Sequence, residues 1–160
     1  MRELAAVGVQ PKDAVARDAD RLARFNGEAP AMIPLVTAPP GEPAAMADRE
    51  TYEWYRTIEP KRLATWRNEV TLRSVEAIAG YEPGDYIARI SPTPLMLVVA
   101  QHDVLTHSDL AFAAYERALH PKQLVTLPGG HFVVFDQEFK NTLTLMTRFF
   151  LQHLASRTAA

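Results

Sequence analysis

The sequence of 160 residues contains no cysteine, which excludes disulfide bonds and thiolate metal sites. It has no glycine-rich phosphate loop, and its net charge of −2 gives no basic surface of the kind that binds nucleic acid or anionic lipid. No apolar run approaches the ~20 residues that span a bilayer, and the N-terminal stretch lacks the pattern of a signal peptide. These absences predict a cytoplasmic protein without a cofactor, a nucleic-acid partner or a membrane partner.

The most informative stretch is a strand–helix–strand pattern in the second half of the chain. The apolar run Leu95 to Ala100 predicts a strand buried on both faces, and Lys122 to Leu127 predicts a second strand. Between them, Thr106 and Asp109 have the spacing of a capping box that would begin a helix. A β-α-β unit of this length should be parallel, so both strands should end at the same edge of the sheet.

An aspartate and a histidine follow the ends of these two strands. Asp103 comes after the first strand, and His131 comes after the second, behind Gly129 and Gly130. We expect both side chains at the carboxyl edge, where open α/β sheets bind ligands. A neutral imidazole accepts protons near pH 7, and a carboxylate on its other nitrogen fixes its tautomer. From the residues alone, surface or helix-capping roles stay open, as does a weaker interpretation of His102, Asp103 and His107 as a metal site.

The order of these motifs resembles the C-terminal portion of an α/β-hydrolase. The resemblance rests on Pro-Thr-Pro-Leu-Met-Leu-Val-Val-Ala-x-x-Asp, an Ala-Tyr-Glu-Arg-Ala helix, and Pro-Lys-x-Leu-Val-x-Leu-Pro-Gly-Gly-His-Phe, and it covers Trp66 to Leu154 well. It implies an α/β fold with the last parallel strands of the sheet and flanking helices. By this likeness, Asp103 is the triad acid and His131 is the triad base.

The nucleophile of that family is missing from the chain. No G-x-S-x-G occurs, and none of the serines has the flanking glycines that the strained nucleophile turn requires. The serines considered are Ser74, Ser91, Ser108 and Ser156. The chain begins roughly where the second half of such an enzyme would begin, so it would be either a portion of a longer protein or a shortened relative.

The resemblance implies two segments, a helical and proline-rich cap-like segment at residues 1–65 and a hydrolase core portion at residues 66–160. In the first, Asp13 to Phe25 predicts an amphipathic helix with Val15, Leu22 and Phe25 buried. Asp48 should cap a helix that carries Tyr52, Trp54 and Tyr55, as pocket lining or as packing. At the end of the chain, apolar residues at helical spacing predict a core-facing stripe, formed by Phe139, Leu143, Met146, Phe149, Phe150 and Leu154.

Two functions follow from this interpretation. The first is hydrolysis of an ester, thioester or amide-like bond in a small-molecule acyl substrate, by a Ser-His-Asp mechanism whose serine lies outside this chain. The alternative is a non-catalytic remnant that serves as an interaction or structural module. Because few strands remain, an open sheet edge and an uncovered face predict a homo-oligomer such as a dimer, or association with a chain that supplies the missing half.

Overall fold

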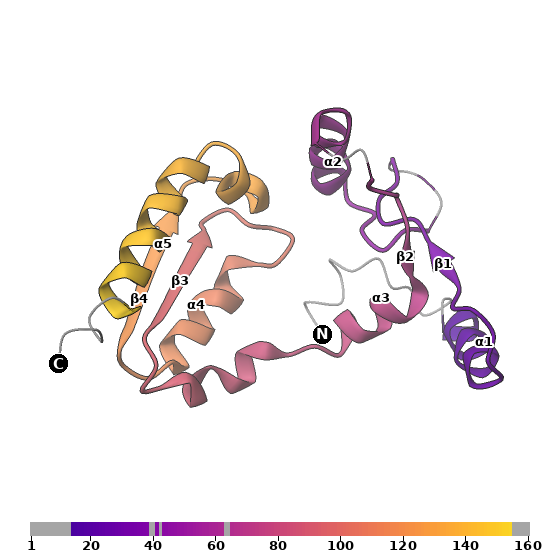
Figure 1. The fold of residues 1–160 in the computed structure, drawn as a ribbon, viewed down its shortest axis with the longest axis horizontal. Helices are drawn as coiled ribbons and strands as arrows, with labels where there is room; N and C mark the ends of the chain where they lie inside the picture. Colours follow the sequence, from indigo (N-terminus) through magenta and orange to yellow (C-terminus); the bar gives the residue numbers. More distant parts are fainter. Residues whose placement is uncertain (1–13, 39–40, 42, 63–64, 155–160) are drawn as a thin grey trace. The chain divides into compact units, whose positions relative to one another are not determined.

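The computed structural model describes residues 14–38, 41, 43–62 and 65–154, and the chain divides into two compact units, Met1–Tyr81 and Glu82–Ala160 (Figure 1). The boundary expected after residue 65 stays a prediction, and Ser156 lies outside the described residues. Each unit is described by itself below.

The first unit is mainly helical and contains one very short antiparallel strand pair. Its elements are α1 Ala14–Phe25, β1 Met32–Ile33, α2 Arg49–Arg62, β2 Val70–Thr71 and α3 Leu72–Ala79. Asp48 caps α2 as expected, since its Oδ1 accepts a 2.7 Å hydrogen bond from the amide of Thr51. Of the aromatic residues on this helix, Tyr55 packs edge to face against Trp54, with ring centroids 5.1 Å apart, and stacks on Trp66, which follows the helix, at 5.5 Å.

The prediction of which α1 residues are buried was wrong. Val15, Leu22 and Phe25 are 79%, 63% and 88% exposed, whereas Asp20 is 5% exposed. The buried face of α1 is therefore the polar face that carries Asp20. Asp20 accepts one hydrogen bond from the amide of Ala31, outside the helix, and one from Arg24 on the same helix. Hydrogen bonding removes the cost that burial of a carboxylate would otherwise carry.

The second unit contains the strand–helix–strand pattern. Its elements are η3 Pro83–Ile90, β3 Leu95–Ala100, α4 Ser108–Arg117, β4 Lys122–Leu127, η4 His131–Phe135 and α5 Phe139–Leu154, where η marks a 3₁₀ helix. Both strands are confirmed, and they pair in parallel with Leu95 opposite Lys122 and Ala100 opposite Leu127. The core of this unit centres on Ala100, Leu127 and Val133.

Two local predictions about this unit were wrong. Only Val99 and Ala100 of β3 are buried, and the other four residues are half-buried, because among the described residues its sheet contains only β3 and β4. The capping box is not formed either: α4 begins at Ser108, and the Thr106 hydroxyl is hydrogen-bonded to Asp103 instead.

The expectation that the whole apolar stripe of α5 faces the core was also wrong. Phe149 is half-buried, but the remaining stripe residues are exposed, and the buried α5 residue is Thr142. In Figure 1, α5 lies on the β4 side of the strand pair and α4 on the β3 side. Within the described part of the chain, no helix has the length and apolar character needed to cross a bilayer.

Candidate active site

The segments that carry the aspartate and the histidine stay paired beyond the ends of the strands. The amide of Gln101 donates to the Leu127 carbonyl, and the amide of His102 donates to the Gly129 carbonyl, each at 2.9 Å. The parallel ladder therefore continues for two residues past β3. Asp103 follows the first of these paired segments directly, and His131 follows the second after Gly130.

A glycine turn sets the direction of His131. Gly129 has φ +136°, a backbone conformation that L residues with a side chain rarely adopt. A Cβ atom at Gly129 would also lie 2.7 Å from Cγ2 of Val133, a core residue. The absence of a side chain therefore lets the chain turn tightly over the core and place His131 as the first residue of η4.

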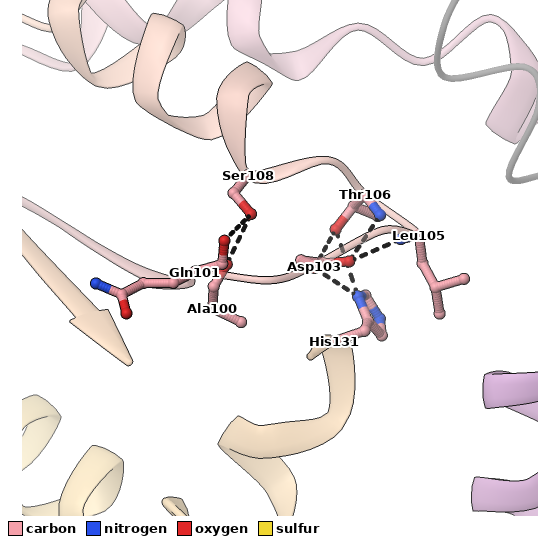
Figure 2. Close-up of polar contacts among 7 residues, drawn as sticks. All are labelled: Ala100, Gln101, Asp103, Leu105, Thr106, Ser108 and His131. Carbon is pink, nitrogen blue, oxygen red and sulfur yellow. Dashed lines mark hydrogen bonds and ion pairs between the residues drawn. The ribbon is translucent and has the colours of Figure 1, made fainter. Parts of the chain in front are cut away.

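The Asp103 carboxylate accepts four hydrogen bonds, two on each oxygen (Figure 2). Its Oδ1 accepts from the backbone amides of Leu105 at 2.9 Å and Thr106 at 3.0 Å. Its Oδ2 accepts from the Thr106 hydroxyl at 2.8 Å and lies 2.8 Å from Nδ1 of His131. The carboxylate is thus held in one orientation, with one oxygen directed at the imidazole.

These contacts determine the ionisation of Asp103. Partial burial raises the pKa of this carboxyl, but the amide of Thr106, the imidazole of His131 and the hydroxyl of Thr106 together outweigh the effect of burial. The pKa of Asp103 therefore lies below its ordinary value of 3.8, and the group is a carboxylate at neutral pH.

The carboxylate also sets the tautomer of His131. Ionised Asp103 can only accept a hydrogen bond, so Nδ1 must carry the proton and Nε2 of the neutral ring has a free lone pair. Among the described residues, Nε2 has no hydrogen-bond partner. The His131 side chain is 29% exposed, against 11% for Asp103, so the ring has a solvent-accessible part while the carboxylate is largely covered. This arrangement can accept a proton at Nε2.

Thr106 belongs to this site, although we had expected it to begin a helix. Its amide and its hydroxyl contact different oxygens of Asp103, and its Oγ1 lies 3.4 Å from Nδ1 of His131. The sequence signal was the spacing Asp103-x-x-Thr106, since an aspartate often accepts hydrogen bonds from the amides two and three residues further on.

The two described serines of the second unit have other partners. Ser91 donates to the His120 carbonyl, and Ser108 donates to the carbonyls of Ala100 and Gln101, which ties the start of α4 to the end of β3. Figure 2 shows the Ser108 hydroxyl directed at the backbone of this strand end. In the part of the chain that the structure describes, no serine is hydrogen-bonded to His131, and no group of three or more His, Asp or Glu side chains could hold a metal ion.

The fold is shared with solved structures. Over 89% of its length the chain superposes on α/β hydrolase GrgF from Penicillium sp. sh18, with a TM-score of 0.71 and 23% identity. Over 91% of its length it superposes on DcsB, solved with its substrate analogue, with a TM-score of 0.73 and 21% identity. The chain has part of an α/β-hydrolase fold. The partial hydrolase fold expected from the sequence is thus confirmed.

This hydrolase-fold chain spans about half the length of the proteins it resembles, namely 48% of GrgF and 51% of DcsB. A thiohydrolase from Eupenicillium brefeldianum is 22% identical over 137 residues, which are 83% of this chain and 44% of the thiohydrolase. No family model matches the sequence.

Proposed function

We propose that this chain carries the acid–base part of an acyl-hydrolase site, with His131 as general base and Asp103 as the carboxylate that orients it. The observation that carries the proposal is the 2.8 Å contact between Nδ1 of His131 and Oδ2 of Asp103. It is supported by the fixed orientation of the carboxylate and by the hydrolase fold of the neighbours.

The proposed reaction begins with proton removal at Nε2 of His131. A nucleophilic hydroxyl gives its proton to Nε2 as its oxygen forms a bond to the acyl carbon. The imidazolium that results is stabilised by Asp103 across Nδ1. When the bond between the acyl carbon and its sulfur, oxygen or nitrogen substituent breaks, the leaving group takes the electron pair and the proton on Nε2. In the full mechanism the hydroxyl belongs to a serine outside this chain, and water then attacks the resulting acyl-serine, gives its proton to Nε2 of His131 and releases the acid as the serine oxygen takes that proton back. When the chain acts alone, a water molecule takes the place of the serine hydroxyl and hydrolysis is complete in one cycle.

Among ester, thioester and amide-like substrates, a thioester suits this site best. A thiol has an ordinary pKa of about 8.5, so a thiolate leaves with little help from an acid, whereas an amine must be protonated first. Cleavage of a thioester therefore depends less than cleavage of an amide on delivery of the proton from Nε2 of His131, and the site is better matched to a thioester. The similarity to a thiohydrolase supports the same substrate class.

A second candidate function is a non-catalytic interaction or structural module. It is favoured by the contacts of Ser91 and Ser108, both of which donate to backbone carbonyls and neither of which approaches His131. Under this alternative, the pair formed by Asp103 and His131 stabilises the edge of the sheet and performs no chemistry.

Hydrolysis of a p-nitrophenyl thioester and of the matching oxygen ester by the purified chain separates the two functions. We expect slow hydrolysis, faster for the thioester, that falls by about 10²–10⁴-fold in His131→Ala, the range typical for a positioned general base. His120→Ala is the control, because it removes an imidazole from the same unit without touching Asp103. Equal rates in the wild-type chain, both variants and buffer would reject the enzymatic function for this chain and leave the module.

A further inference from the structure

The hydrogen bond to Asp103 holds the imidazole of His131 at one ring atom. Nδ1 lies 2.8 Å from Oδ2 of Asp103, and the Thr106 hydroxyl lies 3.4 Å from the same nitrogen. Contacts at a single atom fix where that atom lies, but they let the rest of the ring swing about it. Because the lone pair of Nε2 lies in the plane of the ring, such a swing changes the direction from which Nε2 can accept a proton. A well-directed base therefore needs a second contact on the ring.

Phe132 makes a contact of this kind. Its ring centroid lies 4.8 Å from the centroid of the His131 ring, and the two ring planes are at 84°. This is the edge-to-face arrangement that aromatic rings favour at centroid distances of about 4.5–7 Å. The imidazole cannot swing about Nδ1 without losing this arrangement, so the contact resists the motion that the hydrogen bond permits.

The backbone that carries Phe132 is itself fixed. Phe132 is half-buried in η4, and the next residue, Val133, belongs to the core of the second unit. The amide of Val133 donates to the Gly130 carbonyl at 3.1 Å, and the carbonyl of Val133 accepts from the amides of Asp136 and Glu138. Core packing and hydrogen bonds thus hold the chain beside Phe132, so its ring can act as a stationary surface for the imidazole.

An aromatic ring suits this task because it does not compete for the imidazole nitrogens. A hydroxyl, amide or carboxylate packed on His131 could form a hydrogen bond with Nε2 and occupy the atom that the proposed reaction uses. The side chain of Phe132 has neither a donor nor an acceptor. It can therefore hold the ring while Nε2 stays available to an attacking hydroxyl.

The two contacts on His131 have different consequences for the base. We propose that Phe132 is a positioning residue that acts through His131, by fixing the plane of the imidazole and with it the direction of the Nε2 lone pair. In this arrangement Asp103 sets the tautomer and Phe132 sets the plane. The expected effect on rate rests on the function proposed above, whereas the expected effect on the mobility of the imidazole does not.

The mobility of the His131 ring tests the contact without any substrate. ¹³C relaxation of the imidazole C–H groups in the purified chain gives their order parameters, with His131→Ala to assign the signals. We expect a wild-type value of about 0.85, as for a rigid backbone, and a fall below about 0.6 in Phe132→Leu. Phe132→Tyr keeps the ring and should keep the wild-type value. Phe139→Leu is the matched control, because it removes the same ring from an exposed position in the same unit, and the value should not change.

Hydrolysis of the p-nitrophenyl thioester tests the consequence for the rate. In Phe132→Leu we expect kcat to fall by about 10–100-fold, since a misplacement of about 1 Å can cost about 10²-fold. KM should stay within about twofold, because the leucine disturbs the direction of the base and not the binding of the substrate. Phe132→Tyr should recover most of kcat, and Phe139→Leu should match the wild type. Far-UV circular dichroism checks that every variant is folded.

The two measurements separate failure of this proposal from failure of the proposed function. If the wild-type chain does not hydrolyse the thioester but Phe132→Leu makes the His131 ring mobile, the positioning of the ring is supported and the hydrolase function is rejected. A His131 ring that is already mobile in the wild type, or one that stays rigid in Phe132→Leu, would overturn the proposal even if the rate falls. A ring that becomes mobile in an active chain while kcat is unchanged would overturn it too.

Discussion

Two aspartates, one in each unit, bind their neighbours in the same pattern but face different partners. Asp20 accepts a hydrogen bond from the amide of Ala31 on Oδ1 and one from the guanidinium of Arg24 on Oδ2. Asp103 accepts hydrogen bonds from two backbone amides on Oδ1. On Oδ2 it accepts hydrogen bonds from the Thr106 hydroxyl and from Nδ1 of His131. Arginine stays protonated and has no acceptor atom, so the first contact can only hold structure. Histidine can gain and lose a proton near neutral pH, so the second contact can support chemistry.

The largest expected effect is the loss of hydrolysis when the charge of Asp103 is removed, compared with removal of the charge of Asp20. Asp103→Asn should reduce the thioester hydrolysis described above by up to about 10⁴-fold, and by no more than His131→Ala does, because an amide side chain can hold the imidazole in the wrong tautomer. Asp20→Asn should leave the rate within about twofold, since its contacts lie within the first unit. Initial rates of both variants make the comparison, and equal losses would remove the distinction between the two aspartates.

A smaller effect on hydrolysis is expected at Thr106, whose hydroxyl shares Oδ2 of Asp103 with His131. Thr106→Val removes this hydrogen bond to a charged group while keeping the shape, and we expect a rate loss of about tenfold. Thr106→Ser keeps the hydroxyl and should recover most of the rate. Rates measured at several substrate concentrations should place the loss in kcat. If the valine and serine variants behave alike, the hydroxyl has no positioning role.

The structural role of Asp20 should appear in thermal unfolding. Asp20→Ala leaves the Ala31 amide and the Arg24 guanidinium without their acceptor, so Tm should fall. Asp18→Ala is the matched control on the same helix, because Asp18 is an exposed residue whose ion pair with Arg21 is exposed on both sides. Differential scanning calorimetry compares the two, and a Tm loss in Asp18→Ala as large as that in Asp20→Ala would contradict the structural assignment.

The smallest expected effect is on the acid dependence of stability. The Ala31 amide and Arg24 hold the pKa of Asp20 below its ordinary 3.8, and the pKa of Asp103 is also lowered. A lowered folded-state pKa means that the unfolded chain binds protons more readily, so the contribution to stability is present above about pH 4 and is lost as pH falls further. Urea unfolding between pH 6 and pH 3 should show a shallower acid loss in Asp20→Asn and in Asp103→Asn than in the wild type.

The site was largely predictable from the sequence, and the packing of the helices was not. β3 and β4 were readable because short apolar runs bounded by turn residues define strands locally, and parallel pairing then placed Asp103 near His131. Thr106 was misread because the same residue types can begin a helix or bind a nearby carboxylate, and the choice depends on where the Asp103 side chain lies.

Which face of a helix is buried depends on elements far away in the sequence. Periodicity correctly found the apolar rows of α1 and α5, but it could not tell whether the chain provides a surface to cover them. In α1, the hydrogen bonds of Asp20 orient the polar face inward and leave Phe25 in solvent. In α5, one row meets the core while Leu143 and Phe150 stay exposed.

The central claim is that Asp103 holds His131 with a proton on Nδ1 and a free lone pair on Nε2. Long-range ¹H–¹⁵N correlation spectra of the histidine side chains measure this tautomer directly in the purified chain, with His131→Ala to assign the signals. We predict that His131 in its neutral form carries its proton on Nδ1, and that Asp103→Ala shifts it toward the Nε2-protonated form. A neutral His131 that carries its proton on Nε2 in the wild type, or a tautomer that Asp103→Ala leaves unchanged, would contradict the account.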